Sequence, residues 1–163
     1  MIIVKLTDKE INKSVECAKM FRQSVVEKNR KQPGYVATEN EDYNSALNGV
    51  MSEVAASKWF EIDYTYDWSY DPTRHDLTNG VEVRSTQHIK GHLILELADK
   101  FAPHILAIVH PVSKVVVLQG WINLIDGLQP KYYREPPIVR TASYWIPQSD
   151  LCDMKLLKAK LAA

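Results

Sequence analysis

Two acidic residues and an arginine lie close together in the segment HDLTNGVEVRST, residues 75–86. If a three-residue loop ends at Gly80 in the left-handed conformation, Asp76 faces Glu82 across a β-hairpin, with their Cβ atoms roughly 5 Å apart. A two-residue Asn-Gly turn would instead place the two acids on opposite faces. Strand alternation puts Arg84 on the same face as Glu82. Carboxylates that close repel unless a cation lies between them, and Mg²⁺ prefers such oxygen ligands. The segment therefore predicts a divalent-metal site, or else acids that face solvent on a longer or distorted hairpin.

A third carboxylate, Glu53, lies in a segment of helical periodicity, NGVMSEVAASKWF. Its neighbours on the helix surface are small: Ala46, Gly49, Ala56 and Ser57. Small neighbours allow a carboxylate to lie against an adjacent sheet, and such a close approach would compensate for Gly49, which weakens a helix by about 1 kcal/mol relative to alanine. The alternative is a solvated glutamate on a surface helix, and the helix taken alone favours that alternative.

Two helices are expected in the first part of the chain, where apolar residues recur at helical spacing. The first covers residues 8–30, and Thr7 with Glu10 has the form of a capping box at its start. The second runs from Tyr43 to Phe60, with Asn44 or Ser45 as the cap. These helices would carry Glu53 towards whatever structure holds the other acids.

Strands are expected in the rest of the chain, because β-favouring residues alternate or form short apolar runs. The expected strands cover residues 61–71, 71–78, 80–86, 104–111 and 113–122. Residues 91–101 fit either a helix or a strand, and residues 126–139 form a proline-rich loop. A last helix is expected in residues 149–161, capped by Ser149 or Asp150. This order of elements predicts one α/β or α+β domain with a mixed central sheet, made of the first helix and a core of residues 43–163.

The helix acid, the turn and the following acid-x-base motif together resemble the PD-(D/E)xK nuclease superfamily, and in particular its small phage-type members. The matching positions are Glu53, Asp76 and the tripeptide Glu82-Val83-Arg84, and the resemblance covers most of the chain. It implies a restriction-endonuclease-like core and metal-dependent endonuclease activity that hydrolyses phosphodiester bonds in DNA. Asp76, Glu82 and the carbonyl of Val83 would bind Mg²⁺ or Mn²⁺, and Glu53 would ligate directly, through water or at a second metal. It also allows for a homodimer.

Arg84 occupies the position where the family has lysine. Arginine stays protonated and cannot act as a base, although it can bind phosphate with two hydrogen bonds. Either metal-activated water needs no side-chain base, or Lys90 or Lys58 takes the role of the missing lysine. A further alternative is a domain on the same fold that binds nucleic acid but cuts slowly or not at all.

Other basic and aromatic residues are candidates for contacts with nucleic acid. His88 and Lys90 follow the motif directly, and Lys131 and Arg134 lie in the segment KYYREPP, which mixes charge with aromatic rings. An ordinary surface loop explains that segment equally well. His88 and His92 are spaced for one helix face, but a zinc site needs at least one more ligand, so partly exposed histidines are the favoured interpretation.

Composition limits the remaining possibilities. The 163 residues carry no net charge, with 45% apolar and 25% charged residues, which is typical of a globular domain and excludes a strongly basic nucleic-acid binder. No apolar run reaches the roughly 18 residues of a membrane span, and the start does not form a signal peptide. Cys17 and Cys152 form no metal-binding pair, so two free thiols are expected.

We expect a cytoplasmic protein, encoded by a phage and acting in the host cell. A phage or host interaction domain with only solvated acids is the third alternative.

Overall fold

The centre of the molecule is a four-stranded mixed sheet. The computed structural model describes residues 1–27, 39–66, 73–110, 112–135 and 142–162. The strand order is β1 (Ile2–Lys5), β5 (Val115–Asn123), β4 (Pro103–His110) and β2 (Glu82–Thr86). Strands β2 and β4 are parallel and the other neighbours are antiparallel. The fold is therefore α+β with a mixed sheet, as the order of elements predicted.

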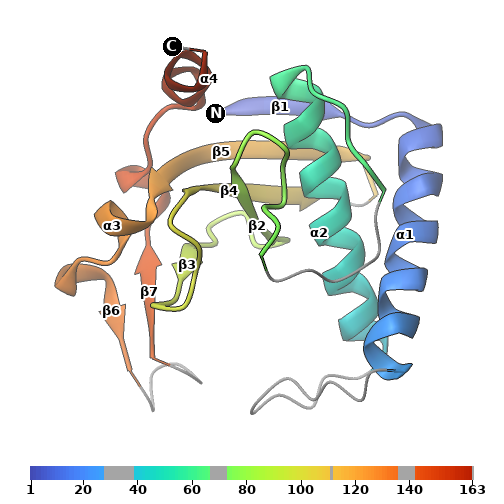
Figure 1. The fold of residues 1–163 in the computed structure, drawn as a ribbon, viewed down its shortest axis with the longest axis horizontal. Helices are drawn as coiled ribbons and strands as arrows, with labels where there is room; N and C mark the ends of the chain where they lie inside the picture. The colour runs from blue at the N-terminus through green and yellow to red at the C-terminus, as the bar shows by residue number, and fades with distance from the viewer. Residues whose placement is uncertain (28–38, 67–72, 111, 136–141, 163) are drawn as a thin grey trace.

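Two long helices cover one face of this sheet (Figure 1). Helix α2 (Glu39–Phe60) packs on all four strands, and α1 (Asp8–Glu27) packs against α2. The predicted capping box forms at the start of α1, where the backbone N–H of Thr7 donates to the Glu10 carboxylate at 2.6 Å and the Glu10 N–H donates to the Thr7 hydroxyl at 3.2 Å. Two N–H groups at the start of α1 are thereby satisfied by the side chains of Thr7 and Glu10.

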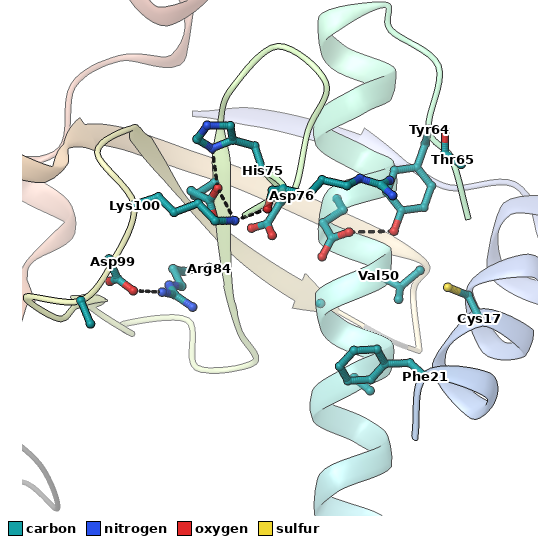
Figure 2. A pocket seen from close by; sticks show the side chains of 16 residues that line it. Cys17, Phe21, Val50, Tyr64, Thr65, His75, Asp76, Arg84, Asp99 and Lys100 are labelled. Atoms are coloured by element: carbon teal, nitrogen blue, oxygen red, sulfur yellow. Dashed lines mark hydrogen bonds and ion pairs between the residues drawn. The ribbon is translucent and has the colours of Figure 1, made fainter. Parts of the chain in front are cut away.

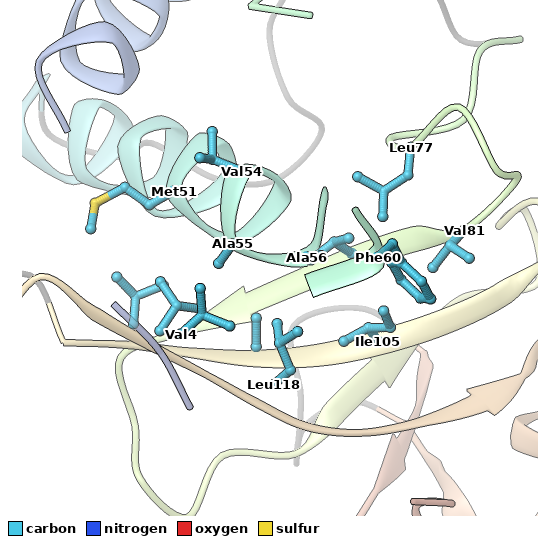
Figure 3. Close-up of a cluster of buried hydrophobic side chains, with 14 of the residues drawn as sticks. Val4, Met51, Val54, Ala55, Ala56, Phe60, Leu77, Val81, Ile105 and Leu118 are labelled. Carbon is cyan, nitrogen blue, oxygen red and sulfur yellow. The ribbon is translucent and has the colours of Figure 1, made fainter. Parts of the chain in front are cut away.

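The core between α2 and the sheet contains apolar side chains from both layers (Figure 3). Met51 and Val54 of α2 face Ile105 of β4 and Leu118 of β5, and all four are at most 4% exposed. Burial of such side chains from water is the main favourable contribution to folding. This packing fixes the position of α2 relative to strand β2, and with it the position of Glu53.

A second, antiparallel sheet covers the opposite face. Its order is β3 (Leu93–Leu95), β7 (Ser143–Ile146) and β6 (Tyr133–Arg134). A separate apolar cluster, which includes Leu106 of β4, fills the space between the two sheets. Strand β4 is thus buried on both faces. The remaining elements are the short helices α3 (Leu124–Gly127), η1 (Pro130–Tyr132), η2 (Gln148–Asp150) and the C-terminal helix α4 (Met154–Leu161).

Several predicted elements differ from the structure. Residues 61–66 and 73–78 form no strand, and residues 67–72 lie outside the described part of the chain. Tyr64 and Tyr66 pack edge to face and against the core, so their aromatic alternation serves packing against helices instead of strand pairing. Strand β1 was missed because it has only four residues, and β3 settles residues 91–101 as containing a strand.

The predicted hairpin is wrong, but its loop is right. Strand β2 pairs in parallel with β4 and not with the segment that carries Asp76. The loop still has the three-residue form, because the N–H of Leu77 donates to the carbonyl of Val81 at 3.1 Å and Gly80 has a φ of 81°. Left-handed φ values favour glycine, which explains the choice of residue at this position. The two acids are therefore joined by a turn without being a cross-strand pair.

Two predicted helix caps are also wrong. Asn44 and Ser45 lie inside α2, which begins at Glu39. Helix α4 is capped by Asp153, whose carboxylate accepts the N–H of Lys155 at 2.8 Å, and not by Ser149 or Asp150. Those two residues belong to the preceding 3₁₀ turn.

Candidate active site

A pocket of about 490 Å³ opens between α2, the start of β2 and the segment that joins β3 to β4. Glu53, Asp76 and Glu82 all line it, although they come from three different parts of the fold. Figure 2 shows the polar side chains and the hydrogen bonds among them. The structure therefore brings the three sequence-predicted carboxylates into one concave site.

Glu53 lies on the face of α2 that borders the pocket. It retains some contact with solvent there but is otherwise surrounded by protein, and the hydroxyl of Tyr64 donates to its Oε2 atom at 2.7 Å. Burial raises the pKa of Glu53 to about 8, and the charges of Asp76 and Glu82 act in the same direction. The interpretation of Glu53 as a solvated surface glutamate is wrong.

Gly49, beside Glu53, does not serve the close packing that the sequence indicated. A Cβ atom added at Gly49 would meet nothing within 4 Å. Gly49 lines the pocket, so the missing side chain leaves open space beside the carboxylates.

Asp76 is held by the backbone of β2. Its Oδ2 atom accepts the N–H of Val83 at 2.8 Å. Strand β2 is at the edge of the sheet, so this side chain satisfies an N–H group that has no neighbouring strand on that side. Burial raises the pKa of Asp76, and the hydrogen bond from Val83 acts in the opposite direction.

Glu82 is buried, with 7% exposure, and two basic side chains meet at one of its oxygens. His75 Nδ1 lies 2.7 Å and Lys100 Nζ lies 3.1 Å from Glu82 Oε1. The Lys100 ammonium also donates to the carbonyl of Arg74, which fixes its position. A buried carboxylate requires such partners, because an unpaired charge away from water is costly.

Lys100 was missed in the sequence, and so were His75 and Tyr64. Lys100 follows Asp99 in residues 91–101, a segment whose periodicity fits either a helix or a strand. No local pattern in the sequence therefore connected Lys100 to Glu82. Arg84 is paired with Asp99 at the side of the pocket. The ammonium group that touches the acidic cluster therefore comes from the β3–β4 segment and not from β2.

The lysines named from the sequence as replacements lie elsewhere. Lys58 donates to Glu10 and to the carbonyl of Lys5, and does not line the pocket. Lys90 is exposed in the loop after β2 and also lies outside the pocket. Neither takes the role of the missing lysine.

The other nucleic-acid candidates are at the surface, and none of them lines the pocket. His88 is exposed, Lys131 contacts Asp150 at 3.5 Å, and Arg134 donates to the carbonyls of Lys131 and Tyr133. The segment from His88 to His92 is not helical, so the two histidines do not share a helix face. Cys17 is buried and Cys152 is exposed, and no disulfide joins the two thiols.

Comparisons with protein-family models, with curated proteins and with solved structures find no match to the chain. The nuclease resemblance thus remains a hypothesis that rests on the residues themselves. None of the helices in the described ranges is long and apolar enough to cross a membrane.

The chemistry of the donor set fits a hard divalent cation. Three carboxylates line one pocket. The charges of Asp76 and Glu82 raise the pKa of Glu53, and the charge of Glu82 raises the pKa of Asp76, a repulsion that a cation between them would relieve. As the side chains lie, no three His, Cys, Asp or Glu residues of the described part form a ready metal cluster. Metal binding at this site therefore requires side-chain movement, including release of the Glu82 carboxylate oxygen that Lys100 and His75 now hold.

Proposed function

We propose that this protein is a divalent-metal-dependent nuclease that hydrolyses phosphodiester bonds in DNA, on a restriction-endonuclease-like core. The observation that carries the proposal is the meeting of Glu53, Asp76 and Glu82 in one pocket, with Lys100 on Glu82. Three acids and one ammonium in a concave site supply the charges that phosphoryl transfer needs, since that reaction depends mainly on positioning and charge stabilisation.

Asp76 and Glu82 would hold the Mg²⁺ or Mn²⁺ ion, together with the backbone carbonyl of Val83, and Glu53 would complete the site directly or through water. A bound ion of this kind lowers the pKa of its water ligand and neutralises charge on the phosphate. Val83 is suited to this position, because its N–H already fixes Asp76 beside β2. His75 keeps Glu82 in place through a hydrogen bond of its own.

Lys100 would bind the scissile phosphate or orient the attacking water. Lysine can lose its proton when its surroundings favour it, which arginine cannot do. Arg84, half-exposed beside Asp99, would stabilise phosphate charge at the mouth of the pocket. The division of roles assigns to Lys100 the function that the family motif gives to a lysine on β2.

The test is cleavage of supercoiled, linear and branched DNA with Mg²⁺ or Mn²⁺. Asp76→Ala and Glu82→Ala should abolish cleavage with folding retained, and Lys100→Met should reduce it by at least about tenfold. Glu16→Gln is the matched control, because it removes an exposed carboxylate of α1 outside the pocket. Cleavage that survives both alanine substitutions would refute the proposal. Metal-dependent DNA binding without cleavage would instead support a binding module, and the absence of both would support an interaction domain.

A further inference from the structure

The pocket has an apolar half next to its charged half. Cys17 and Phe21 of α1 and Ala46, Gly49 and Val50 of α2 line this side. Figure 2 shows Phe21, Val50 and Cys17 together on the helices, away from Arg84, Asp99 and Lys100. A purely ionic site would need no apolar wall of this kind.

Open space at Gly49 forms part of the apolar half. Nothing lies within 4 Å of a Cβ atom added there, and the pocket of about 490 Å³ is within the range of small-molecule sites. Glycine in the middle of a helix costs about 1 kcal/mol relative to alanine. Helix packing does not require it here, so the residue is better explained by the space that it leaves.

We propose that the apolar half binds one unpaired nucleobase, from a nucleotide next to the scissile phosphate. This inference rests on the proposed nuclease function, which places the phosphate at Lys100 and the carboxylates. A base is a flat group with apolar faces, and it is attached to the chain within one nucleotide of that phosphate. Phe21 offers an aromatic side chain to it, as in proteins that bind single strands by stacking.

The substrate class follows from the same geometry. A base inside a duplex is stacked and paired, and it must be extruded before it can enter a pocket, at a cost of a few kcal/mol. Single strands, bulges and mismatches avoid most of that cost. The enzyme should therefore prefer DNA with an unpaired nucleotide at the cleavage site over a perfect duplex.

The experiment combines one pocket variant with one altered substrate. Gly49→Leu fills the apolar half, and Ser45→Leu is the matched control, because it adds the same side chain at an exposed position of the same helix. The substrates are a single-stranded oligonucleotide and copies in which an abasic site replaces each nucleotide around the cleaved bond. Circular dichroism melting checks that both variants fold.

For the wild type, one abasic position should lower kcat/KM by at least about tenfold, the size expected from one stacked base. Gly49→Leu should lose at least about tenfold on the intact strand and should match the wild type on the abasic strand, while Ser45→Leu should behave as the wild type on both. Equal cleavage of intact and abasic strands by the wild type, or full activity of Gly49→Leu on the intact strand, would overturn the base site.

A binding measurement separates this inference from the proposed function. Fluorescence anisotropy, with Ca²⁺ in place of Mg²⁺ or Mn²⁺, compares binding of the intact and abasic strands directly. If the wild type discriminates between them but never cuts with Mg²⁺ or Mn²⁺, the nuclease proposal fails and the base site stands. If it cuts without discriminating, the base site fails and the nuclease proposal stands. If it neither cuts nor discriminates, both are refuted.

Discussion

Glu53→Gln should remove a pH dependence from the stability of the protein. The pKa of Glu53 in the folded chain is about 8, against an ordinary 4.5, because the carboxyl is buried near two other acids. Between those two values the unfolded chain has released the proton and the folded chain still holds it. Unfolding therefore releases a proton, and the free energy of unfolding falls as the pH rises towards 8. Glutamine has no such proton, but it can still accept the hydrogen bond from Tyr64.

The size of the effect follows from the linkage relation. One proton contributes at most about 1.4 kcal/mol per pH unit, so the wild type should lose about 1.5–2 kcal/mol between about pH 6.5 and 8 relative to Glu53→Gln. The window begins at pH 6.5 because of His104, whose pKa burial lowers from its ordinary 6.5. Below that value the unfolded chain takes up a proton at this histidine, which gives stability the opposite slope.

Urea denaturation followed by tryptophan fluorescence at half-unit pH steps, without divalent metal, measures the two free energies. The difference between wild type and variant removes contributions that both share, including that of His104. Glu16→Gln, an exposed change on α1, should leave the wild-type slope intact. If the difference between the wild type and the Glu53→Gln variant stays constant across this pH window, the burial and charge coupling deduced for Glu53 are refuted.

Three further substitutions test other parts of the site and fold. Asp76→Ala should lower the free energy of unfolding by about 1–3 kcal/mol more than Asp76→Asn, because alanine leaves a backbone N–H of β2 without its acceptor; equal urea midpoints would contradict this. Arg84→Lys should change kcat/KM for DNA by less than about threefold, roughly 0.6 kcal/mol, since the site already has its ammonium group; a large gain would show that arginine limits the reaction. Gly120→Ala should destabilise by about 1–3 kcal/mol, because the new Cβ would lie 2.7 Å from that of Leu151; an unchanged thermal midpoint would contradict this packing.

The features that sequence analysis predicted correctly are those with local causes. The capping box at Thr7 and the left-handed loop at Gly80 each depend on a few neighbouring residues, and both are confirmed. The mixed sheet followed from the order of elements. The failure that matters most for the site concerns pairing: a turn between two β-favouring segments indicated a hairpin, but β2 pairs with β4, which is buried on both faces.

The acids of the site were predictable, but their partners were not. The turn between Asp76 and Glu82 linked these two acids. Glu53 joined them only through the order of the three acids along the chain, because its helix taken alone favoured a solvated glutamate. Lys100 and Tyr64 lie 18 and 11 residues from the acids that they contact. Lys100 is in a segment whose periodicity was ambiguous, and Tyr64 is in one whose alternation indicated a strand. Only the packing of the β3–β4 segment over the pocket brings Lys100 to Glu82, and periodicity carries no information about it.

The position of Lys100 changes the meaning of the arginine on β2. In the sequence, an arginine at the basic position of the acid-x-base motif implied that the site lacks a lysine, whose ammonium group can lose its proton. In the structure, the buried carboxylate of Glu82 takes its counter-charge from Lys100, while Arg84 pairs with Asp99, the residue just before that lysine. The two ion pairs hold the same segment against β2, and one of them places an ammonium group beside Glu82. Under the proposed nuclease function, Lys100 would take the place of the motif lysine, and Arg84 by itself would be no reason to expect an inactive site.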